Sequence, residues 1–447
     1  MKKILYFIIG VLVILVGATS CSDEDSSVPI EEKYTQQTIL MYLPWTGDAS
    51  GSNSGLYHFF LNNIDSVEAA IVKNKGTNDC RILVYINDRP QRGCLYEIKY
   101  ENNKCVADTI QMYSGKEFTT SNGIAQIVGD AFKYAPALNY AMTVGCHGSG
   151  WTYKEDWGNY PSETKGDRFR RQKETSLSDE LHFYDTRFFG SVNDYESIQQ
   201  YGVNIETLTD GLKIALNEIT YPAGFKHKLQ YLLFDDCYMC NMEIAYQVRD
   251  VTNFMVASTS EVMAIGMPYY SMWSYMHGNN PSYSGMVNAF NAFYTNYSSP
   301  YGAIAAIDCR KAENMATIMK KINKKYALPD SLRDSIQCLD GMFTLNRPGL
   351  FFDMKDYVDH LYDKNGVSIT KANDDDLYTN FCTSFNELVV AKKTTPNIYT
   401  SLSRYYSTAF EVKRFNGITL SDFSVHPVAL SGKEKTAWWK ATHGTDL

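Results

Sequence analysis

The chain has 447 residues, 44% of them hydrophobic, and a formal net charge of −8 at pH 7. This charge argues against nucleic acid or an anionic membrane surface as a partner, because both bind through positive charge on the protein. The length is enough for one large α/β domain with an appendage, which can fold without disulfides.

The first residues predict an exported protein. Lys2 and Lys3 precede an apolar run, Ile4 to Ala18, which is too short and wrongly flanked for a stable membrane span. The small residues that end at Cys21 resemble the lipobox of bacterial lipoproteins, in which this cysteine becomes the acylated first residue. An ordinary signal peptide with cleavage nearby is the alternative.

We therefore interpret residues 1–20 as a lipoprotein signal peptide and residues 21–36 as an acidic flexible tether. Acidic residues directly after the lipid cysteine resemble the surface-export signal of Bacteroidetes lipoproteins. A lipid anchor in the outer membrane, facing the cell exterior, is expected. Disulfides are common in exported chains, but the nine cysteines left after lipidation of Cys21 are an odd number, so at least one lies outside any intramolecular pair.

Strand-like apolar runs alternate with amphipathic helical patterns along the chain. Such alternation predicts a mostly parallel sheet that is covered by helices on both faces. In chain order, we expect a strand at 38–45, a helix at 56–73, a strand at 81–88, a hairpin over 94–112, a helix at 121–134, a strand before Gly145, a helix at 204–219, and strand–helix units that begin near 229, 254 and 301.

Two regions depart from this alternation. Residues 151–203 are polar and irregular and contain the basic cluster Lys165 to Lys173, so they form an exposed insertion. We assign residues 37–310, including this insertion, to the core. Residues 311–447 are assigned to a smaller mixed subdomain, with a hairpin-like pattern near 409–428.

Chemically unusual residues follow two of the predicted strands. His147 follows one apolar strand and precedes Gly-Ser-Gly, and Cys237 follows the strand that begins at Leu229. Because sites in parallel sheets form at the carboxyl ends of strands, the imidazole and the thiol can meet as the base and the nucleophile of a hydrolase. The N–H groups of Gly148 and Cys237 can bind the oxyanion of a tetrahedral intermediate.

Two aspartates precede this thiol, although nearby negative charge raises the pKa of a cysteine. Residues two apart on a strand share a face at about 7 Å, so Asp235 is expected beside Cys237, whereas Asp236 points away. A carboxylate at that distance can bind a cation of the substrate. We therefore predict that Asp235 selects arginine or lysine side chains, and that the following helix and a protonated His147 offset its effect on the thiolate.

These residues resemble the clostripain-like cysteine peptidases, relatives of caspases, legumains and gingipains. The matching motifs are "HGSGW" from His147, Asp-x-Cys-x-Met from Asp235, and the stretch "VASTSEVMAIGMPY" from Val256. Their order and spacing are similar over 38–308. The resemblance implies a caspase-like three-layer α/β sandwich with a mostly parallel central sheet.

The resemblance also implies a function. In this family the histidine is the general base, the cysteine is the nucleophile, and the aspartate two residues before it recognises arginine or lysine. These roles correspond to His147, Cys237 and Asp235 and imply protein or peptide substrates that contain arginine or lysine.

Members of the family mature by cleavage between the histidine and the cysteine, which makes Arg170, Arg171 and Lys173 candidate sites of self-cleavage. Some members depend on calcium, but the chain has no EF-hand loop, so we predict neither a cofactor nor a metal site and leave calcium open.

Three alternatives remain open. Cys237 and Cys240 form a C-x-x-C pair before a helix, as in thiol-disulfide oxidoreductases, although the preceding aspartates disfavour a reactive first cysteine. Cys146, His147 and the same two cysteines are enough ligands for zinc, but adjacent strand residues face opposite ways. The third alternative is a surface lipoprotein that has kept the peptidase fold for binding and lost activity.

Overall fold

The computed structural model of the chain describes residues 34–157, 199–219, 221, 228–297, 302–341, 348–364, 376–400 and 408–444. The signal segment, Cys21 and the three candidate cleavage residues Arg170, Arg171 and Lys173 lie outside these ranges. Within them, no helix has both the length and the apolar character needed to span a bilayer.

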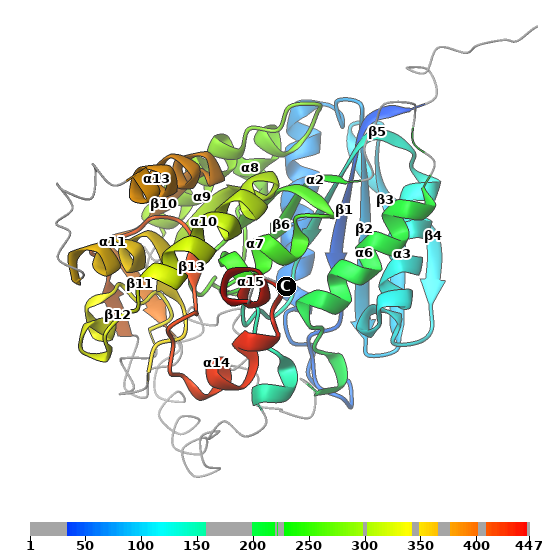
Figure 1. Cartoon of the computed structure of the whole chain (residues 1–447). Helices are drawn as coiled ribbons and strands as arrows, with labels where there is room; N and C mark the ends of the chain where they lie inside the picture. The colour runs from blue at the N-terminus through cyan, green and yellow to red at the C-terminus, as the bar shows by residue number, and fades with distance from the viewer. Residues whose placement is uncertain are drawn as a thin grey trace, which may run out of the picture.

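A nine-stranded sheet forms the centre of the molecule (Figure 1). Its order is β10-β8-β7-β6-β5-β1-β2-β3-β4. The strands are β1 (Thr35–Leu43), β2 (Cys80–Arg89), β3 (Arg92–Glu101), β4 (Lys104–Tyr113), β5 (Ala137–Val144), β6 (Leu229–Phe234), β7 (Thr252–Ala257), β8 (Ala303–Asp308) and β10 (Val389–Thr394).

The strands in the middle of the sheet are parallel. This holds for the neighbours β2, β1, β5, β6 and β7. Antiparallel strands flank them, namely the predicted hairpin β3–β4 on one side and β8 with β10 on the other. The predicted α/β class with a mostly parallel central sheet is therefore confirmed.

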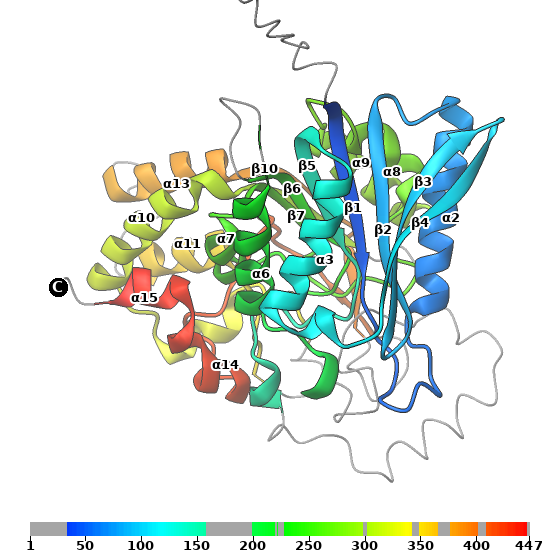
Figure 2. The same cartoon turned by 90° about the vertical axis from the view of Figure 1, so that its right-hand side faces the viewer.

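Helices cover both faces of the sheet, as the alternating pattern predicted. One face packs against α2, α8 and α9, and the other packs against α3, α6, α7 and α10. In Figure 2, α3 and α6 lie in front of the sheet, and α8 and α9 lie behind it. The helices are α2 (Tyr57–Asn74), α3 (Ser121–Tyr134), α6 (Ile205–Glu218), α7 (Met242–Val248), α8 (Tyr269–Met276), α9 (Tyr283–Thr295), α10 (Ala312–Lys325), α11 (Met354–Lys364), α13 (Asp376–Leu388), α14 (Pro427–Gly432) and α15 (Ala437–His443).

The C-terminal region contributes to the main sheet and adds small sheets of its own. Strand β10 pairs with β8 at one edge of the main sheet. The small sheets pair β11 (Asn397–Thr400) with β12 (Thr408–Glu411), and β13 (Thr419–Leu420) with β9 (Phe352–Asp353). The predicted hairpin over 409–428 is wrong, because β12 and β13 each pair with a strand outside that range.

Local sequence explains how the helix after Cys237 begins. The Asn241 side chain accepts a hydrogen bond from the Ile244 N–H at 3.0 Å, which caps α7. Residues on the buried side of α7, such as Met242 and Ala245, are fully buried in the core between the sheet and the helices. The segment between β6 and α7 is therefore fixed at both ends.

Candidate active site

The two predicted strand ends lie side by side. Strands β5 and β6 are parallel neighbours, and Val144 is in register with Phe234. The Asp235 N–H extends this pairing by donating to the Val144 carbonyl oxygen at 2.7 Å. His147 and Cys237 each follow a strand by three residues, so both lie at the same edge of the sheet.

The loops that carry His147 and Cys237 touch each other at Gly148. A Cβ atom on Gly148 would lie 2.4 Å from the Cys237 carbonyl oxygen and 2.9 Å from its backbone nitrogen, so only glycine fits. Gly150 has φ of +66° and lies against the carbonyl oxygen of Tyr238 and the ring of Phe351. These two glycines therefore bring the backbone of the His147 loop against the turn that contains Cys237.

The thiol of Cys237 is buried beneath the loop that follows β7. Its sulfur accepts a hydrogen bond from the Val262 N–H at 3.1 Å and lies 3.6 Å from the Val262 carbonyl oxygen. The residue has no exposed surface. The position of this loop therefore determines the direction in which the Cys237 sulfur points.

The two aspartates before Cys237 point to opposite faces, as their adjacent positions predicted. Asp235 accepts hydrogen bonds from the Met267 N–H at 2.9 Å and the Tyr269 hydroxyl at 3.0 Å, on the face covered by α8. Asp236 accepts one from the Cys146 N–H, on the opposite face. Both carboxylates are buried.

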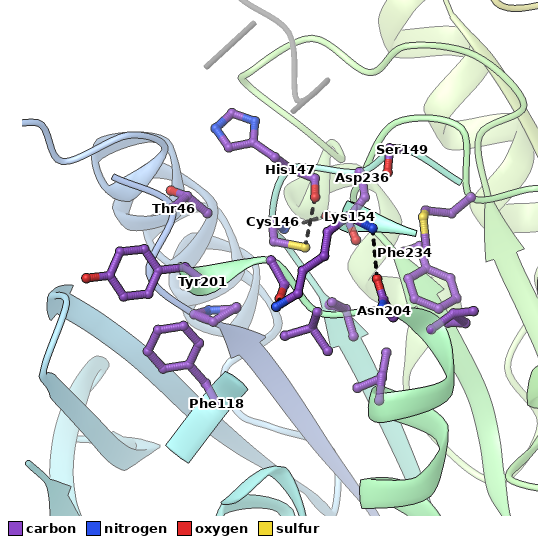
Figure 3. Close-up of a pocket in the computed structure, with 18 of the residues that line it drawn as sticks. Thr46, Phe118, Cys146, His147, Ser149, Lys154, Tyr201, Asn204, Phe234 and Asp236 are labelled. Carbon is purple, nitrogen blue, oxygen red and sulfur yellow. Dashed lines mark hydrogen bonds between the residues drawn. The ribbon is translucent and has the colours of Figure 1, made fainter. Parts of the chain in front are cut away.

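A largely apolar pocket lies beside the His147 loop, on the face to which Asp236 points (Figure 3). Figure 3 shows the His147 ring directed away from Cys146 and Lys154. Aromatic and aliphatic walls of this kind can hold an apolar side chain of a bound peptide. The side chains that form these walls include those of Tyr42, Phe118, Val144, Tyr201, Leu208 and Phe234.

Hydrogen bonds of Lys154 join the chain before the insertion to the chain after it. Its ammonium donates to the carbonyl oxygens of Gln199 at 3.1 Å and Gly202 at 2.9 Å. The Gln199 amide donates back to the Lys154 carbonyl oxygen at 2.8 Å, and the Lys154 N–H donates to Asn204 Oδ1 at 3.0 Å. The chain before residue 158 is thus held directly against the chain after residue 198.

Cys240, the second cysteine of the C-x-x-C pair, is buried in the core. The Cys240 thiol lies 3.1 Å from the Gly417 carbonyl oxygen, and burial raises its pKa well above the usual value. No disulfide joins any two of the nine cysteines that the structure describes.

The zinc alternative needs ligands that gather around one point. Among the described residues, no three His, Cys, Asp or Glu side chains gather in a way that could hold a metal ion. Glu243, on α7, accepts a hydrogen bond from the Ser421 N–H at 2.7 Å, and burial with the nearby charge of Asp422 raises its pKa to about 8. It connects α7 to the C-terminal segment.

Sequence reasoning did not single out two residues beside the thiol. Val262 contacts the sulfur through its backbone, and its only signal was its place in the stretch that starts at Val256. Tyr238, directly after Cys237, has φ of +63°. Tyrosine is not typical of that conformation, so no sequence pattern would have revealed it.

The chain is similar to known peptidases. A model described as the clostripain family matches residues 192–418. A secreted C11 cysteine protease from Bacteroides thetaiotaomicron is 34% identical to this chain, and the two structures superpose with a TM-score of 0.73. That match covers 92% of this chain and 99% of the protease. No curated protein sequence matches significantly.

Two more distant structures share the fold. An inactive zymogen C11 protease from Parabacteroides distasonis is 18% identical, with a TM-score of 0.65, and the match covers 91% of this chain and 98% of the zymogen. A secreted C11 cysteine protease from Bacteroides thetaiotaomicron, in complex with an irreversible peptide inhibitor, is 16% identical, with a TM-score of 0.66 and coverage of 91% and 99%.

Proposed function

Because the chain belongs to the clostripain family and is a cysteine peptidase, we propose that it cleaves peptide bonds after arginine or lysine, with Cys237 as nucleophile and His147 as general base. The observation that carries this proposal is the contact of their two loops at Gly148, at the carboxyl edge of neighbouring parallel strands. Nucleophile and base must lie within hydrogen-bond reach for such catalysis.

The first half of the proposed reaction forms an acyl-enzyme. His147 takes the thiol proton, and the Cys237 sulfur attacks the carbonyl carbon of the basic residue. The oxyanion that forms accepts hydrogen bonds from the N–H groups of Gly148 and Cys237. When the intermediate collapses, the carbon–nitrogen bond breaks and His147 gives its proton to the leaving amine.

The second half releases the product. His147 takes a proton from water, whose oxygen attacks the thioester carbon, and the same two N–H groups stabilise the oxyanion. Collapse of this intermediate returns the proton to the sulfur and frees the new carboxyl group. Besides the substrate and one water molecule, the proposed steps use only groups of the chain.

The preference for basic residues is assigned to Asp235. Its carboxylate is fully buried and accepts hydrogen bonds from the Met267 N–H and the Tyr269 hydroxyl. A carboxylate binds the guanidinium of arginine or the ammonium of lysine through charge-assisted hydrogen bonds. The basic side chain of a substrate can therefore bind to Asp235.

Fluorogenic peptides test the proposed function. We expect turnover of peptides with arginine or lysine before the cut bond and far slower turnover of matched peptides with leucine or glutamine there. Assays before and after limited trypsin nicking of the insertion cover both the intact and the processed form. Absence of turnover of every basic peptide in both forms would favour the alternative of a binding lipoprotein without activity.

Self-cleavage in the insertion is part of the proposal, with Arg170, Arg171 and Lys173 as the residues before the cut. The hydrogen bonds of Lys154 with Gln199 and Gly202 support it, because they keep both ends of the insertion in place when the chain between them is cut.

Mass spectrometry of the purified protein checks this cleavage. Wild type is expected to yield two fragments that meet after one of the three basic residues, and Cys237→Ala is expected to stay intact. Equal fragmentation of both proteins, or of neither, would contradict self-cleavage.

We also propose that Cys21 carries a lipid that anchors the protein to the outer membrane, on the cell surface. The small residues before Cys21 and the acidic residues after it support this location. The substitution Cys21→Ser is expected to move the protein from the membrane fraction to the soluble fraction of the cell. An unchanged distribution on immunoblots of the two fractions would contradict the anchor.

A further inference from the structure

The turn after Cys237 has a backbone conformation that its sequence does not favour. Tyr238 has φ of +63°, in the left-handed region. In the described parts of the chain, the other non-glycine residues with positive φ are lysine, asparagine or aspartate. A bulky residue keeps this conformation only where the surrounding contacts enforce it.

Contacts to the backbone and the ring hold Tyr238 in place. Its N–H donates to the Ser260 carbonyl oxygen at 3.0 Å, and its carbonyl oxygen accepts from the Asn241 amide at 2.8 Å. Its ring stacks on Phe351 with centroids 5.2 Å apart. The residue is 1% exposed.

The hydroxyl of Tyr238 reaches two acceptors from other parts of the chain. It lies 3.0 Å from Glu261 Oε1 and 3.1 Å from the Asp340 carbonyl oxygen. The same Glu261 oxygen accepts from the Thr400 hydroxyl at 2.8 Å. Burial and the negative charge of Glu261 raise the pKa of Tyr238 well above its usual value, so the hydroxyl remains a donor.

Cys237 and Tyr238 contact neighbouring residues of one loop. The Val262 N–H donates to the Cys237 sulfur, and the adjacent Glu261 accepts from the Tyr238 hydroxyl. A shift of Tyr238 against Glu261 therefore also shifts the sulfur against Val262. The C-terminal region takes part as well, because Asp340 accepts a hydrogen bond from Tyr238 and Thr400 donates one to Glu261.

We propose that Tyr238 is a positioning residue, whose buried hydroxyl fixes the left-handed turn through Glu261 and Asp340 and so sets the direction of the Cys237 sulfur and amide. The inference rests on the proposed role of Cys237 as nucleophile. If Tyr238 has this role, the reactivity of the Cys237 thiol depends on the Tyr238 hydroxyl, which does not contact it. This dependence can be measured without a peptide substrate.

The substitution Tyr238→Phe tests the proposal, because it removes the hydroxyl and keeps the ring on Phe351. We expect kcat for a basic peptide to fall about 10- to 100-fold with little change in KM, since small misplacements of a reacting group cost factors of this size. Alkylation of Cys237 by iodoacetamide, followed by peptide mass spectrometry over a range of pH, is expected to slow as well.

Tyr231→Phe is the matched control. Tyr231 lies on β6, is fully buried, and its hydroxyl makes no hydrogen bond within the described residues. This variant is expected to keep kcat and the alkylation rate within about two-fold of wild type, since it loses no hydrogen bond. A kcat and an alkylation rate for Tyr238→Phe equal to those of Tyr231→Phe would overturn the proposal.

A second pair of variants covers the case in which Tyr238→Phe fails to fold. Glu261→Gln keeps an acceptor oxygen for Tyr238 and is expected to retain alkylation of Cys237. Glu261→Ala leaves the Asp340 carbonyl oxygen as the remaining acceptor of the two, and is expected to slow the alkylation. Equal rates for both would contradict the role of Tyr238. If wild type cleaves no peptide, the proposed function fails, but the alkylation rates still decide the positioning role.

Discussion

Replacing Cys237 with alanine is expected to lower kcat for an arginyl or lysyl peptide by about 10⁴-fold or more, since removal of a catalytic nucleophile has effects of this order. The substitution removes only the buried sulfur that lies against Val262, and the backbone N–H assigned to the oxyanion stays. Fluorogenic turnover measures the loss, and a thermal melt compares the stability of the two proteins.

Cys240→Ala is the control for this prediction. Its thiol lies against the Gly417 carbonyl oxygen inside the core, so the variant is expected to keep peptidase activity. Loss of turnover in both variants, together with insulin-reductase activity of wild type, would instead support a C-x-x-C oxidoreductase. Full activity of Cys237→Ala would remove this cysteine from the mechanism.

Replacing Asp235 with asparagine is expected to lower kcat/KM for basic peptides by about 10²- to 10³-fold, because loss of a desolvated charge pair costs about 2–5 kcal/mol. Asparagine has nearly the same shape, and its oxygen can still accept from the Met267 N–H. The ratio of kcat/KM for an arginyl peptide to that for a matched glutaminyl peptide is the quantity to measure.

Asp236→Asn is the matched control for charge. It removes one carboxylate next to Cys237, but on the opposite face, where Asp236 accepts from the Cys146 N–H. This variant is expected to leave the arginine-to-glutamine ratio unchanged. A similar fall of the ratio in both variants would mean that general negative charge, rather than Asp235, attracts the basic residue.

Much of the fold followed from local sequence patterns. The predicted helix over 121–134 matches α3, and the predicted hairpin over 94–112 is the β3–β4 pair. Pairings between distant segments were missed, because periodicity describes one segment at a time. Strand β10 is an example: its sequence is short and half of it is polar, and it does not show that the strand joins the main sheet beside β8.

The candidate site, too, was predicted from the sequence only in part. Because His147 and Cys237 each follow a predicted parallel strand, the sequence indicated that their loops share an edge of the sheet. The alternation of side chains predicted that Asp235 and Asp236 face opposite ways. The contact of the sulfur with Val262 depends on how two loops pack, and the backbone of Tyr238 is held by tertiary contacts against its own preference. Neither could be read from the residues alone.

The order of strands divides the main sheet into two halves between β5 and β6. The described strands before residue 158 build the half-sheet β5-β1-β2-β3-β4, and those after residue 198 build β10-β8-β7-β6, so the two halves of the sheet meet at the β5–β6 ladder. Helix α3 also contacts α6, and α2 contacts α8, across the same division. His147 belongs to one half and Cys237 to the other. If the insertion is cut as proposed, each fragment holds one of the two proposed catalytic residues, so separated fragments would regain peptidase activity only by reassembling.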